Sequence, residues 1–481
     1  MKNMVKILKK SVKILVLTIG LMLILLIVAI WDDEQKTSYF KIENIDDASN
    51  NSYIITNVNI LPMSKDTILK NKIVYLKSGV IHKISDSIEE QGIPVIDANN
   101  KFLLPGLIDM HVHVWDKYEL GLYLSNGVTA VRNLWGMPMH LRLKKEINTN
   151  KIVAPMLFTT GPKLTGPEFI GDDNLQLFST KEAKEKVIRY KKNGYDFIKT
   201  YYGLDKDLFD AIIAQATRSE MDIIAHPSQK VAYNYHFNSQ IKSIEHAEDI
   251  VQQPLNYKLD SIKLNDLISD FSKFKQTNFC PTLTVYNNIY QMLMDDQILK
   301  TDRMKYLNPL IYMVDSKAQY NRWHNSKLND STIVNSIKEQ HNFHLAIVGK
   351  LHKAGVSIIC GTDAGIGVTV PGFSIHNELA FYKAAGLSNF EVLKTATVNA
   401  AKTHKIMNNL GTIEVGKMAN LILVDENPLL NINTLKNPNI VFINGRKLHH
   451  NLLQSFQEKA KNRSNLIVSA LRYFENFFLQ D

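Results

Sequence analysis

The sequence predicts an α/β fold: a (β/α)8 TIM barrel with a small β-sandwich domain built from both flanking segments, plus an N-terminal transmembrane helix. Three observations support this prediction. Eight short apolar segments alternate with helical patterns through the middle of the chain, as expected for parallel strands joined by crossover helices. Alternating, turn-separated segments typical of antiparallel strands lie on both sides of this middle region. A long apolar run precedes them, at residues 14–31.

The apolar run at residues 14–31 is long enough to cross a bilayer, because its eighteen residues span roughly 27 Å at about 1.5 Å each. Lysines precede it and acidic residues follow it, which predicts a cytoplasmic N-terminus and a body on the periplasmic or extracellular face. No good small-x-small cleavage site follows, so residues 1–31 are interpreted as an uncleaved signal anchor. The alternative is a signal peptide removed after export, which would leave a secreted protein.

Two strand-rich pieces flank the middle of the chain, at residues 52–102 and 406–450. Short alternating segments fill both of them, and we expect the two to assemble into one β-sandwich domain. The polar residues 32–51 are interpreted as a linker. Residues 451–481 carry apolar side chains at helical spacing and predict a helical tail that docks on its own domain, with a membrane-surface or dimer contact as the alternative.

Residues 103–405 are predicted to form the barrel. Its eight apolar strands are expected at residues 103–110, 129–134, 156–160, 197–200, 223–225, 243–245, 279–283 and 357–360. The long, aromatic-rich connection at residues 286–335 is expected to cover the barrel mouth as a lid or to pack outside it. Working residues of such a barrel stand at the C-terminal ends of the strands, which gives a test for each candidate.

Composition excludes several classes of protein. The 481 residues suffice for one barrel and a smaller domain, and a charged content of 21% with 45% hydrophobic residues excludes a disordered chain. Five lysines before the apolar run account for part of the formal net charge of +9, leaving +4 elsewhere, and no basic tract with interleaved aromatics supports nucleic-acid binding. Cys280 and Cys360 lie in apolar runs and are interpreted as buried thiols.

Candidate metal ligands stand at the ends of five predicted strands. His111 and His113 share one face of the first strand, since side chains two apart point the same way. The pair alone would be equally typical of a polar rim. The further candidates at strand ends are Lys199, His226, His246 and Asp363. Each alone has an ordinary structural explanation, but imidazole and carboxylate groups converging on one barrel mouth favour zinc or a similar divalent ion.

Three motifs resemble the amidohydrolase superfamily. Leu-Pro-Gly-Leu-Ile-Asp-Met-His-Val-His at residues 104–113 is similar to the first-strand signature of this superfamily, and residues 396–401 and 410–421 are similar to its closing signature. Gly-Tyr-Asp-Phe-Ile-Lys-Thr-Tyr at residues 194–201 is similar to a motif of its imidazolonepropionase-like and Xaa-Pro dipeptidase-like branch. The resemblance runs from about residue 53 to residue 448 and implies a metal-dependent hydrolase on a (β/α)8 barrel.

The resemblance also implies a site with two divalent metal ions, for which zinc is the expected identity. His111, His113 and Asp363 would hold one ion. His226 and His246 would hold the other.

Two members of the set have further implied roles. Lys199, carboxylated by CO2, would bridge the two ions together with a hydroxide. A charged lysine repels metal ions and a neutral one is a poor ligand, whereas the carbamate is an anionic, bidentate bridge. Asp363 would be the catalytic residue that takes the proton of the attacking hydroxide and passes it to the leaving amine.

Two departures from the superfamily pattern bear on the reaction. Mononuclear deaminases typically carry a glutamate three residues after the fifth-strand histidine, and Gln229 stands at that place. A glutamine cannot shuttle a proton, which favours amide hydrolysis over the deaminase and imidazolonepropionase readings. Asn133 follows Arg132 where relatives often have an aspartate, which leaves the contribution of the second strand open.

Two residues are candidates for substrate binding. Tyr201 is similar to a superfamily tyrosine that meets the substrate carboxylate, although a tyrosine packed at the barrel rim is an equal alternative. His376 is similar to a recurring histidine that could contact substrate or cap a helix.

The leading hypothesis is therefore a membrane-anchored hydrolase acting on a carbon–nitrogen bond in a small molecule or small peptide, with an Xaa-Pro dipeptidase-like activity as one form. One alternative is a mononuclear cyclic-amide hydrolase or deaminase. Another is an inactive barrel that serves as a surface-binding protein. The sequence leaves the substrate and the oligomeric state open.

Overall fold

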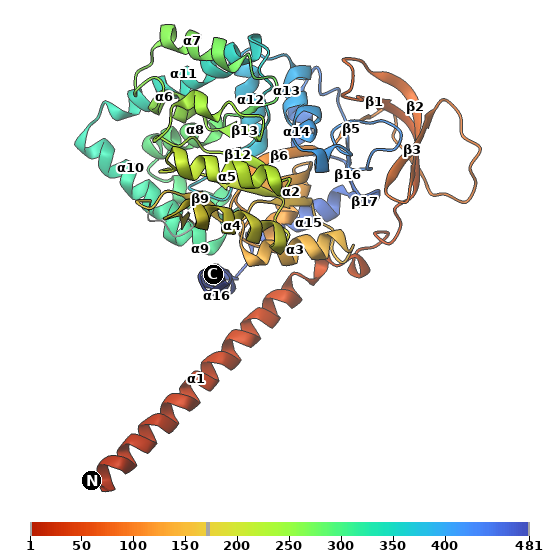
Figure 1. The fold of residues 1–481 in the computed structure, drawn as a ribbon. Helices are drawn as coiled ribbons and strands as arrows, with labels where there is room; N and C mark the ends of the chain where they lie inside the picture. Colours follow the sequence, from red (N-terminus) through yellow and green to blue (C-terminus); the bar gives the residue numbers. More distant parts are fainter. Residues whose placement is uncertain (1, 170–173, 480–481) are drawn as a thin grey trace.

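Parallel strands surround the centre of the body in two hydrogen-bonded groups (Figure 1). One has the order β6-β7-β8, and the other has the order β10-β9-β11-β12-β13-β14. The strands are β6 Leu107–Val112, β7 Val128–Asn133, β8 Met156–Thr159, β9 Lys163–Thr165, β10 Asn174–Gln176, β11 Phe197–Thr200, β12 Asp222–Ala225, β13 Ile241–Glu245 and β14 Asn278–Cys280. The computed structural model describes residues 2–169 and 174–479.

Isolated parallel bridges continue this succession of strands. Thr160 pairs with Phe197, which joins the end of β8 to β11. The segment 357–364 follows β14 through the pair Phe279 and Ile358, and it reaches β6 through the pair Ala364 and Val112.

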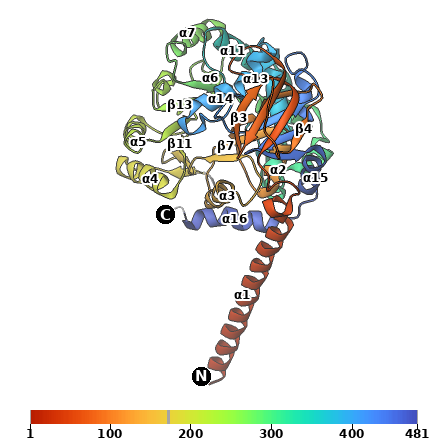
Figure 2. The same cartoon turned by 90° about the vertical axis from the view of Figure 1, so that its right-hand side faces the viewer.

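Helices cover the outside of the parallel strands (Figures 1 and 2). In α4, Ala183, Val187 and Tyr190 recur on one face and are buried, and the Ser179 side chain caps the first turn by accepting a hydrogen bond from the Glu182 amide. The covering helices are α2 Lys117–Ser125, α3 Pro138–Asn148, α4 Thr180–Asn193, α5 Lys206–Arg218, α6 Ala247–Gln252, α7 Ser261–Phe271, α8 Leu283–Met294, α11 Ile333–Lys353, α12 Ser374–Ala384, α13 Asn389–Thr395 and α14 Val398–Thr403.

Strands from both flanks of the chain form one eight-stranded sheet at the side of the body (Figure 1). The order is β17-β16-β15-β5-β1-β2-β3, with β4 also paired to β1. At the far edge the Ile81 amide donates to the Lys417 carbonyl just before β15, so the sheet folds back around its own apolar core. These strands are β1 Tyr53–Ile60, β2 Leu69–Lys77, β3 Val80–Ser85, β4 Val95–Asp97, β5 Phe102–Pro105, β15 Leu421–Val424, β16 Ile440–Ile443 and β17 Arg446–His449.

The first and last predicted barrel strands differ from the structure. Residues 103–110 were expected as one strand, but Gly106 interrupts it and separates β5 from β6. β5 pairs within the flanking sheet, and β6 pairs with the parallel strands. A Cβ at Gly106 would lie 2.2 Å from Thr129 Oγ1, so only glycine fits this crossing. Residues 357–360 form bridges rather than a strand, because the Cys360 amide donates to the Thr395 carbonyl and leaves the ladder.

The strand predicted at residues 279–283 also ends earlier than expected. β14 stops at Cys280, and Leu283 already begins α8. The Glu378 carboxylate accepts hydrogen bonds from the Leu283 and Thr284 amides, which fixes the start of the helix there. Both cysteines are buried and free, as the sequence predicted.

Residues 32–51 pack against the body instead of forming a free linker. Helix α1, Lys2–Lys36, is followed by two short 3-10 turns, Ser38–Phe40 and Ile42–Asn44. The Phe40 ring is fully buried, 5.1 Å from the ring centre of Phe456 in α15, His450–Lys461. This attachment gives the end of α1 a defined place on the body.

The N-terminal helix projects away from the body and is exposed along its apolar part (Figures 1 and 2). The stretch Leu8–Phe40 is long and apolar enough to cross a membrane, with a mean hydropathy of 3.1 over its most apolar 18 residues. This is a statement about length and composition, which signal sequences share.

Candidate active site

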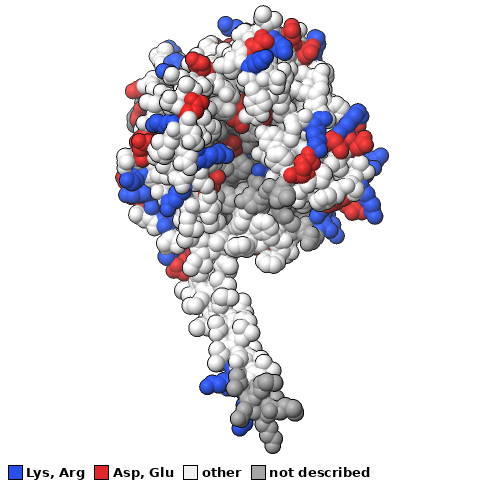
Figure 3. Space-filling view, turned by 90° about the vertical axis from the view of Figure 1, so that its left-hand side faces the viewer, with Lys and Arg blue, Asp and Glu red and all other residues white. Residues whose placement is uncertain are grey.

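A cavity of about 860 Å³ opens at the carboxyl ends of the parallel strands. Figure 3 shows the body hollowed on this side, above the place where α1 leaves it. The structure brings all six predicted metal-site residues to this one cavity: His111, His113, Lys199, His226, His246 and Asp363. His111 and His113 lie at the end of β6, and each of the other four residues lies at the end of a different strand or bridging segment. Their meeting in one cavity therefore depends on the fold and not only on the local motifs.

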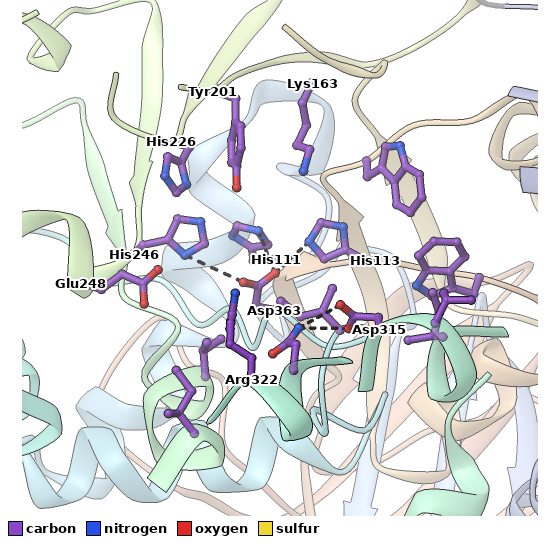
Figure 4. A pocket seen from close by; sticks show the side chains of 18 of the residues that line it. His111, His113, Lys163, Tyr201, His226, His246, Glu248, Asp315, Arg322 and Asp363 are labelled. Atoms are coloured by element: carbon purple, nitrogen blue, oxygen red, sulfur yellow. Dashed lines mark hydrogen bonds and ion pairs between the residues drawn. The ribbon is translucent and has the colours of Figure 1, made fainter. Parts of the chain in front are cut away.

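His111, His113 and Asp363 form one compact group of possible metal ligands (Figure 4). Asp363 Oδ1 lies 2.8 Å from His113 Nε2 and 3.3 Å from His111 Nε2. The Asp363 amide donates to the His111 carbonyl at 2.8 Å, and Asp363 has a positive φ of 57°. Gly361 permits this approach, because a Cβ there would lie 2.4 Å from Cys280 Sγ.

His226 and His246 face each other beside this group, with ring centres 4.6 Å apart. His246 Nδ1 lies 2.9 Å from Thr282 Oγ1 and 4.0 Å from Asp363 Oδ2. His226 Nε2 lies 3.2 Å from Asp249 Oδ2 without hydrogen-bond geometry, and neither ring nitrogen of His226 has a partner within the described part of the chain. Buried ring nitrogens without partners are what a metal ion would satisfy.

Lys199 is the unusual member of the set. Its side chain is fully buried at the end of β11, and its Nζ has no hydrogen-bond partner among residues 2–169 and 174–479. Burial lowers the pKa of Lys199 to about 8, although Glu245 and Asp363 oppose the shift. Burial likewise holds the pKa values of His226 and His246 well below their ordinary value. His226 and His246 are therefore neutral, as metal ligands must be.

Glu245 and Arg132 hold His111 in place from behind. Glu245 Oε2 lies 2.7 Å from His111 Nδ1, and since a carboxylate can only accept, His111 carries its proton on Nδ1 and turns Nε2 toward Asp363. Arg132 donates to Glu245 Oε1 at 2.9 Å and to the Met110 carbonyl. Burial raises the pKa of Glu245, but the charge of Arg132, together with His111 and Lys199, outweighs burial and holds this pKa well below its usual range.

Asn133, at the end of β7, also supports the site. The sequence had left the contribution of this second strand open. Asn133 Oδ1 accepts from the Val114 amide at 2.9 Å, and its Nδ2 donates to the Trp135 carbonyl at 2.6 Å. These bonds fix the turn that follows His113. Cys280 lies close enough to His111 and Glu245 to join a second possible ligand group, but burial raises the pKa of its thiol, so it stays protonated.

Comparison with known proteins agrees with this geometry. The sequence model of the Amidohydrolase family matches residues 303–448. Over this part of its length the chain is similar to the amidohydrolase family, as its sequence motifs predicted. A dihydroorotase of Carboxydothermus hydrogenoformans is 43% identical over 63 residues, which are 13% of this chain and 14% of that protein. An N-acetylglucosamine-6-phosphate deacetylase of Lysinibacillus sphaericus is 37% identical over 62 residues, 12% of this chain and 16% of that protein. The chain thus aligns with about one seventh of the length of such curated relatives.

Solved structures match over most of the chain and show the shared fold. A bottromycin amidohydrolase superimposes with a TM-score of 0.72 and 20% identity, covering 90% of this chain and 97% of that one. A Xaa-Pro dipeptidase with bound methionine gives a TM-score of 0.64 and 19% identity, covering 83% and 100%. A putative prolidase from Bifidobacterium longum gives a TM-score of 0.65 and 22% identity, covering 85% and 99%.

The two predicted substrate residues have different places in the structure. Tyr201 lines the cavity, with its ring 4.3 Å from the His226 ring and with Lys163 Nζ 4.3 Å above it. His376 does not reach the cavity; it is buried within α12, and burial lowers its pKa to about 3. Its side chain instead hydrogen-bonds to the backbone of Asn126, the residue that ends α2, which agrees with the alternative role of a helix cap. Spacing along the chain placed His376 after the last strand, but α12 turns its side chain elsewhere.

Sequence reasoning missed the other walls of the cavity. Part of the connection predicted as a lid does line it, through α9 Pro309–Ile311, a π-helical turn Tyr312–Ser316 and α10 Lys317–Asn329. The C-terminal helix α16, Leu466–Leu479, lines it as well. Residues contributed by these segments are Leu310, Ile311, Val314, Asp315, Gln319, Arg322, Trp323, Ser326, Ala470, Tyr473 and Phe474. Gln229, whose identity weakened the deaminase reading, accepts from the Gly203 amide outside this cavity.

Proposed function

We propose that this amidohydrolase cleaves the amide bond of a small molecule or small peptide at a two-metal centre. The buried Lys199 amine carries this proposal. An amine that is uncharged at moderately alkaline pH and has no described hydrogen-bond partner, in one cavity with four histidines, has no structural use as it stands. Carboxylation by CO2 would convert it into an anionic ligand for two ions.

The donor set fits a pair of divalent ions. His111, His113 and Asp363 would hold one ion, and His226 and His246 would hold the other, with Lys199 between the groups. Imidazole and carboxylate ligands make zinc the expected metal. Bound ions would polarise the amide carbonyl and activate water at neutral pH.

Asp363 would transfer the proton. Burial favours its neutral form, but the adjacent His111 and His113 outweigh burial and hold the pKa of Asp363 well below its usual range. It is therefore a carboxylate at neutral pH, able to accept a proton from the attacking water and pass it to the leaving nitrogen.

Two cations extend the site toward the substrate. Arg322 reaches into the cavity from α10 and Lys163 from the opposite side (Figure 4). The guanidinium of Arg322 lies 5.4 Å from the centre of the Trp323 ring and forms no ion pair within the described residues. An exposed guanidinium suits a substrate carboxylate. The Tyr201 phenol is placed to assist. This arrangement supports a peptide-like substrate with a free carboxylate, as in the prolidases that share the fold.

The finer fold and location belong to the same proposal. Seven parallel strands, β6 to β8 and β11 to β14, and the segment 357–364 would close a (β/α)8 barrel through their bridges. Helix α1 would anchor the enzyme in a membrane and hold the catalytic body on the exported face.

A cyclic-amide hydrolase is the second candidate, because several of the curated relatives are dihydroorotases. Metal content and a substrate panel separate the two. We expect the zinc-loaded full chain to bind two ions and to cleave dipeptides in preference to lactams and cyclic imides. Lys199→Ala should bind fewer ions and lose most activity. One tightly bound ion, with full activity after Lys199→Ala, would overturn the two-metal proposal.

A further inference from the structure

Helix α16 combines two roles that a soluble enzyme would keep apart. One face lines the catalytic cavity through Ala470, Tyr473 and Phe474. The neighbouring face, which shares Phe474 with the first, is apolar and open to solvent: Ile467 is 58% exposed and Phe478 is 82% exposed. With Leu471 and Phe474, these residues recur every three or four positions and form one stripe along the helix. We call Ile467, Leu471, Phe474 and Phe478 the α16 stripe.

The α16 stripe lies at the base of the body, where α1 departs. Figure 2 shows α16 running across this base, with α1 leading away from it. The two helices are tied together: Arg472 donates to Asp33 at 2.7 Å, and both side chains are largely buried. Lys36 Nζ donates to Ser464 Oγ at 3.2 Å, just before α16. The relative placement of α1 and α16 is therefore held by specific polar contacts.

The polar contacts between α1 and α16 also determine the depth of α16 relative to a membrane spanned by α1. The apolar part of α1 ends at Trp31, a residue type enriched at bilayer surfaces, and Asp33 is only two residues further on. At about 1.5 Å per residue, the contact with Arg472 lies roughly 3 Å beyond the end of the apolar stretch. A membrane spanned by α1 would consequently reach the level of α16, whose exposed stripe matches that of helices lying in the interface.

An aromatic path connects this helix with the metal-ligand group. The Tyr473 ring lies 6.0 Å from Trp135 and 6.2 Å from Trp115, and the two indoles are 4.5 Å apart. Trp135 is in turn 6.4 Å from the ring of His113. Ile311 and Val314 add further apolar surface to the same cavity, and Val314 is 54% exposed. An apolar chain could therefore run from the α16 stripe to the reacting carbonyl without leaving apolar surface.

We propose that α16 lies in the membrane interface and admits amides with a long acyl chain from the bilayer into the cavity. This inference rests on the proposed amide hydrolysis and on the proposed anchor. In the reaction, water adds across the C–N bond of the lipid amide and yields a carboxylic acid and an amine. A lipid bilayer is the single partner to which the exposed stripe is assigned.

The first test compares two substrates that differ only in chain length. The zinc-loaded full chain in phosphatidylcholine vesicles is given an N-palmitoyl amino acid or the N-acetyl analogue. The double change Ile467→Glu and Phe478→Glu alters the stripe but not the cavity lining. It should lower the turnover of the palmitoyl substrate about tenfold and that of the acetyl substrate less than about twofold. Ile262→Glu on α7, 78% exposed and remote from α1 in Figure 1, is the matched control and should leave both unchanged.

The outcomes separate this inference from the proposed function. Equal losses for both substrates, or none for either, would overturn entry from the membrane while leaving amide hydrolysis intact. A wild-type protein that cleaves dipeptides but neither acyl substrate would overturn the lipid-amide assignment and leave amide hydrolysis intact. One that cleaves neither acyl substrate nor any dipeptide would overturn the proposed function, and the substrate assignment with it.

A second test needs no activity. Cys280 and Cys360 are buried, so a dye attached to Phe478→Cys reports on that position alone. In vesicles containing brominated lipid, this dye should lose most of its fluorescence, whereas a dye at Ile262→Cys should lose little. Equal quenching at both positions would overturn the inference. Disulfide-linked dimers through residue 478 in place of quenching would assign the stripe to a second copy of the chain, and would also overturn it.

Discussion

The floor and the walls of the cavity are built in different ways. The floor consists of side chains at the ends of β6, β11, β12 and β13 and on the segment 357–364, all buried and held by backbone pairing. The walls come from α9, α10 and α16, which are more exposed. These helices are distant from the floor strands along the sequence and are brought beside them by the tertiary fold. The floor carries groups suited to chemistry, and the walls carry apolar and cationic groups suited to selecting a substrate. Substitutions in the two regions should therefore change different kinetic constants.

Asp363→Asn should cause the largest effect, because it removes the proposed proton carrier, which is also a proposed metal ligand, from the floor. We expect kcat to fall on the order of 10⁴-fold with little change in KM. Steady-state kinetics on the zinc-loaded protein measures this. Asp330→Asn, at an exposed carboxylate ahead of α11, is the control and should behave as wild type. A mere few-fold loss at Asp363 would show that another group moves the proton.

Glu245→Gln should have the next largest effect, because Glu245 only orients His111. Metal affinity and activity should fall about 10- to 100-fold, and excess zinc should restore part of the activity. Glu414→Gln, at an exposed glutamate, is the matched control. Activity that stays low at saturating zinc would mean that Glu245 takes part in the reaction directly.

Arg322→Ala should affect binding rather than chemistry. We expect kcat/KM for a substrate with a free carboxylate to fall about tenfold, and that for the amidated analogue to stay nearly constant. Lys317→Ala on the same helix tests for a general loss of positive charge, since Lys317 does not line the cavity. Equal losses for the two substrates would assign the carboxylate contact elsewhere.

Arg472→Ala should have the smallest effect on turnover but should loosen the wall. It leaves Asp33 buried without its partner, and breaking such a pair costs about 3 kcal/mol. We expect a lower temperature of thermal unfolding and faster proteolysis between α15 and α16, with only a few-fold change in kcat for a short soluble amide. Arg472→Lys keeps the charge and should fall between the two proteins. Unchanged proteolysis would mean that apolar contacts alone hold α16.

Much of the floor could be predicted from the sequence because its residues carry local signals. The two-residue period of a strand places His111 and His113 on one face, and Lys199, His226 and His246 each follow a short apolar run. Local patterns failed where pairing depends on distant partners. Gly106 breaks one apolar run into strands of two different sheets, and Cys360 gives its amide to Thr395 instead of a neighbouring strand.

Residues of the second layer were harder to recognise. Glu245 precedes His246 within a strand, and a buried acid in an apolar run was the one available signal. His376 shows the converse error: a motif-like histidine that the fold places outside the cavity. A residue that directly follows a barrel strand can be placed at the cavity from sequence alone. A residue further along, such as His376, cannot, because the intervening backbone has left the hydrogen bonding of the sheet.

The sequence by itself determined the resemblance to the amidohydrolase family, the alternation of strands and helices, and the candidate metal-binding side chains at the strand ends, because these depend on local periodicity and short motifs. Only the tertiary structure decided that Arg322 and Tyr473, from segments 150 residues apart, complete the same cavity. It also decided that the C-terminal helix meets the end of the N-terminal one through Arg472 and Asp33. Contacts of this kind have no signature along the chain, because burial and charge pairing act between surfaces that folding brings together.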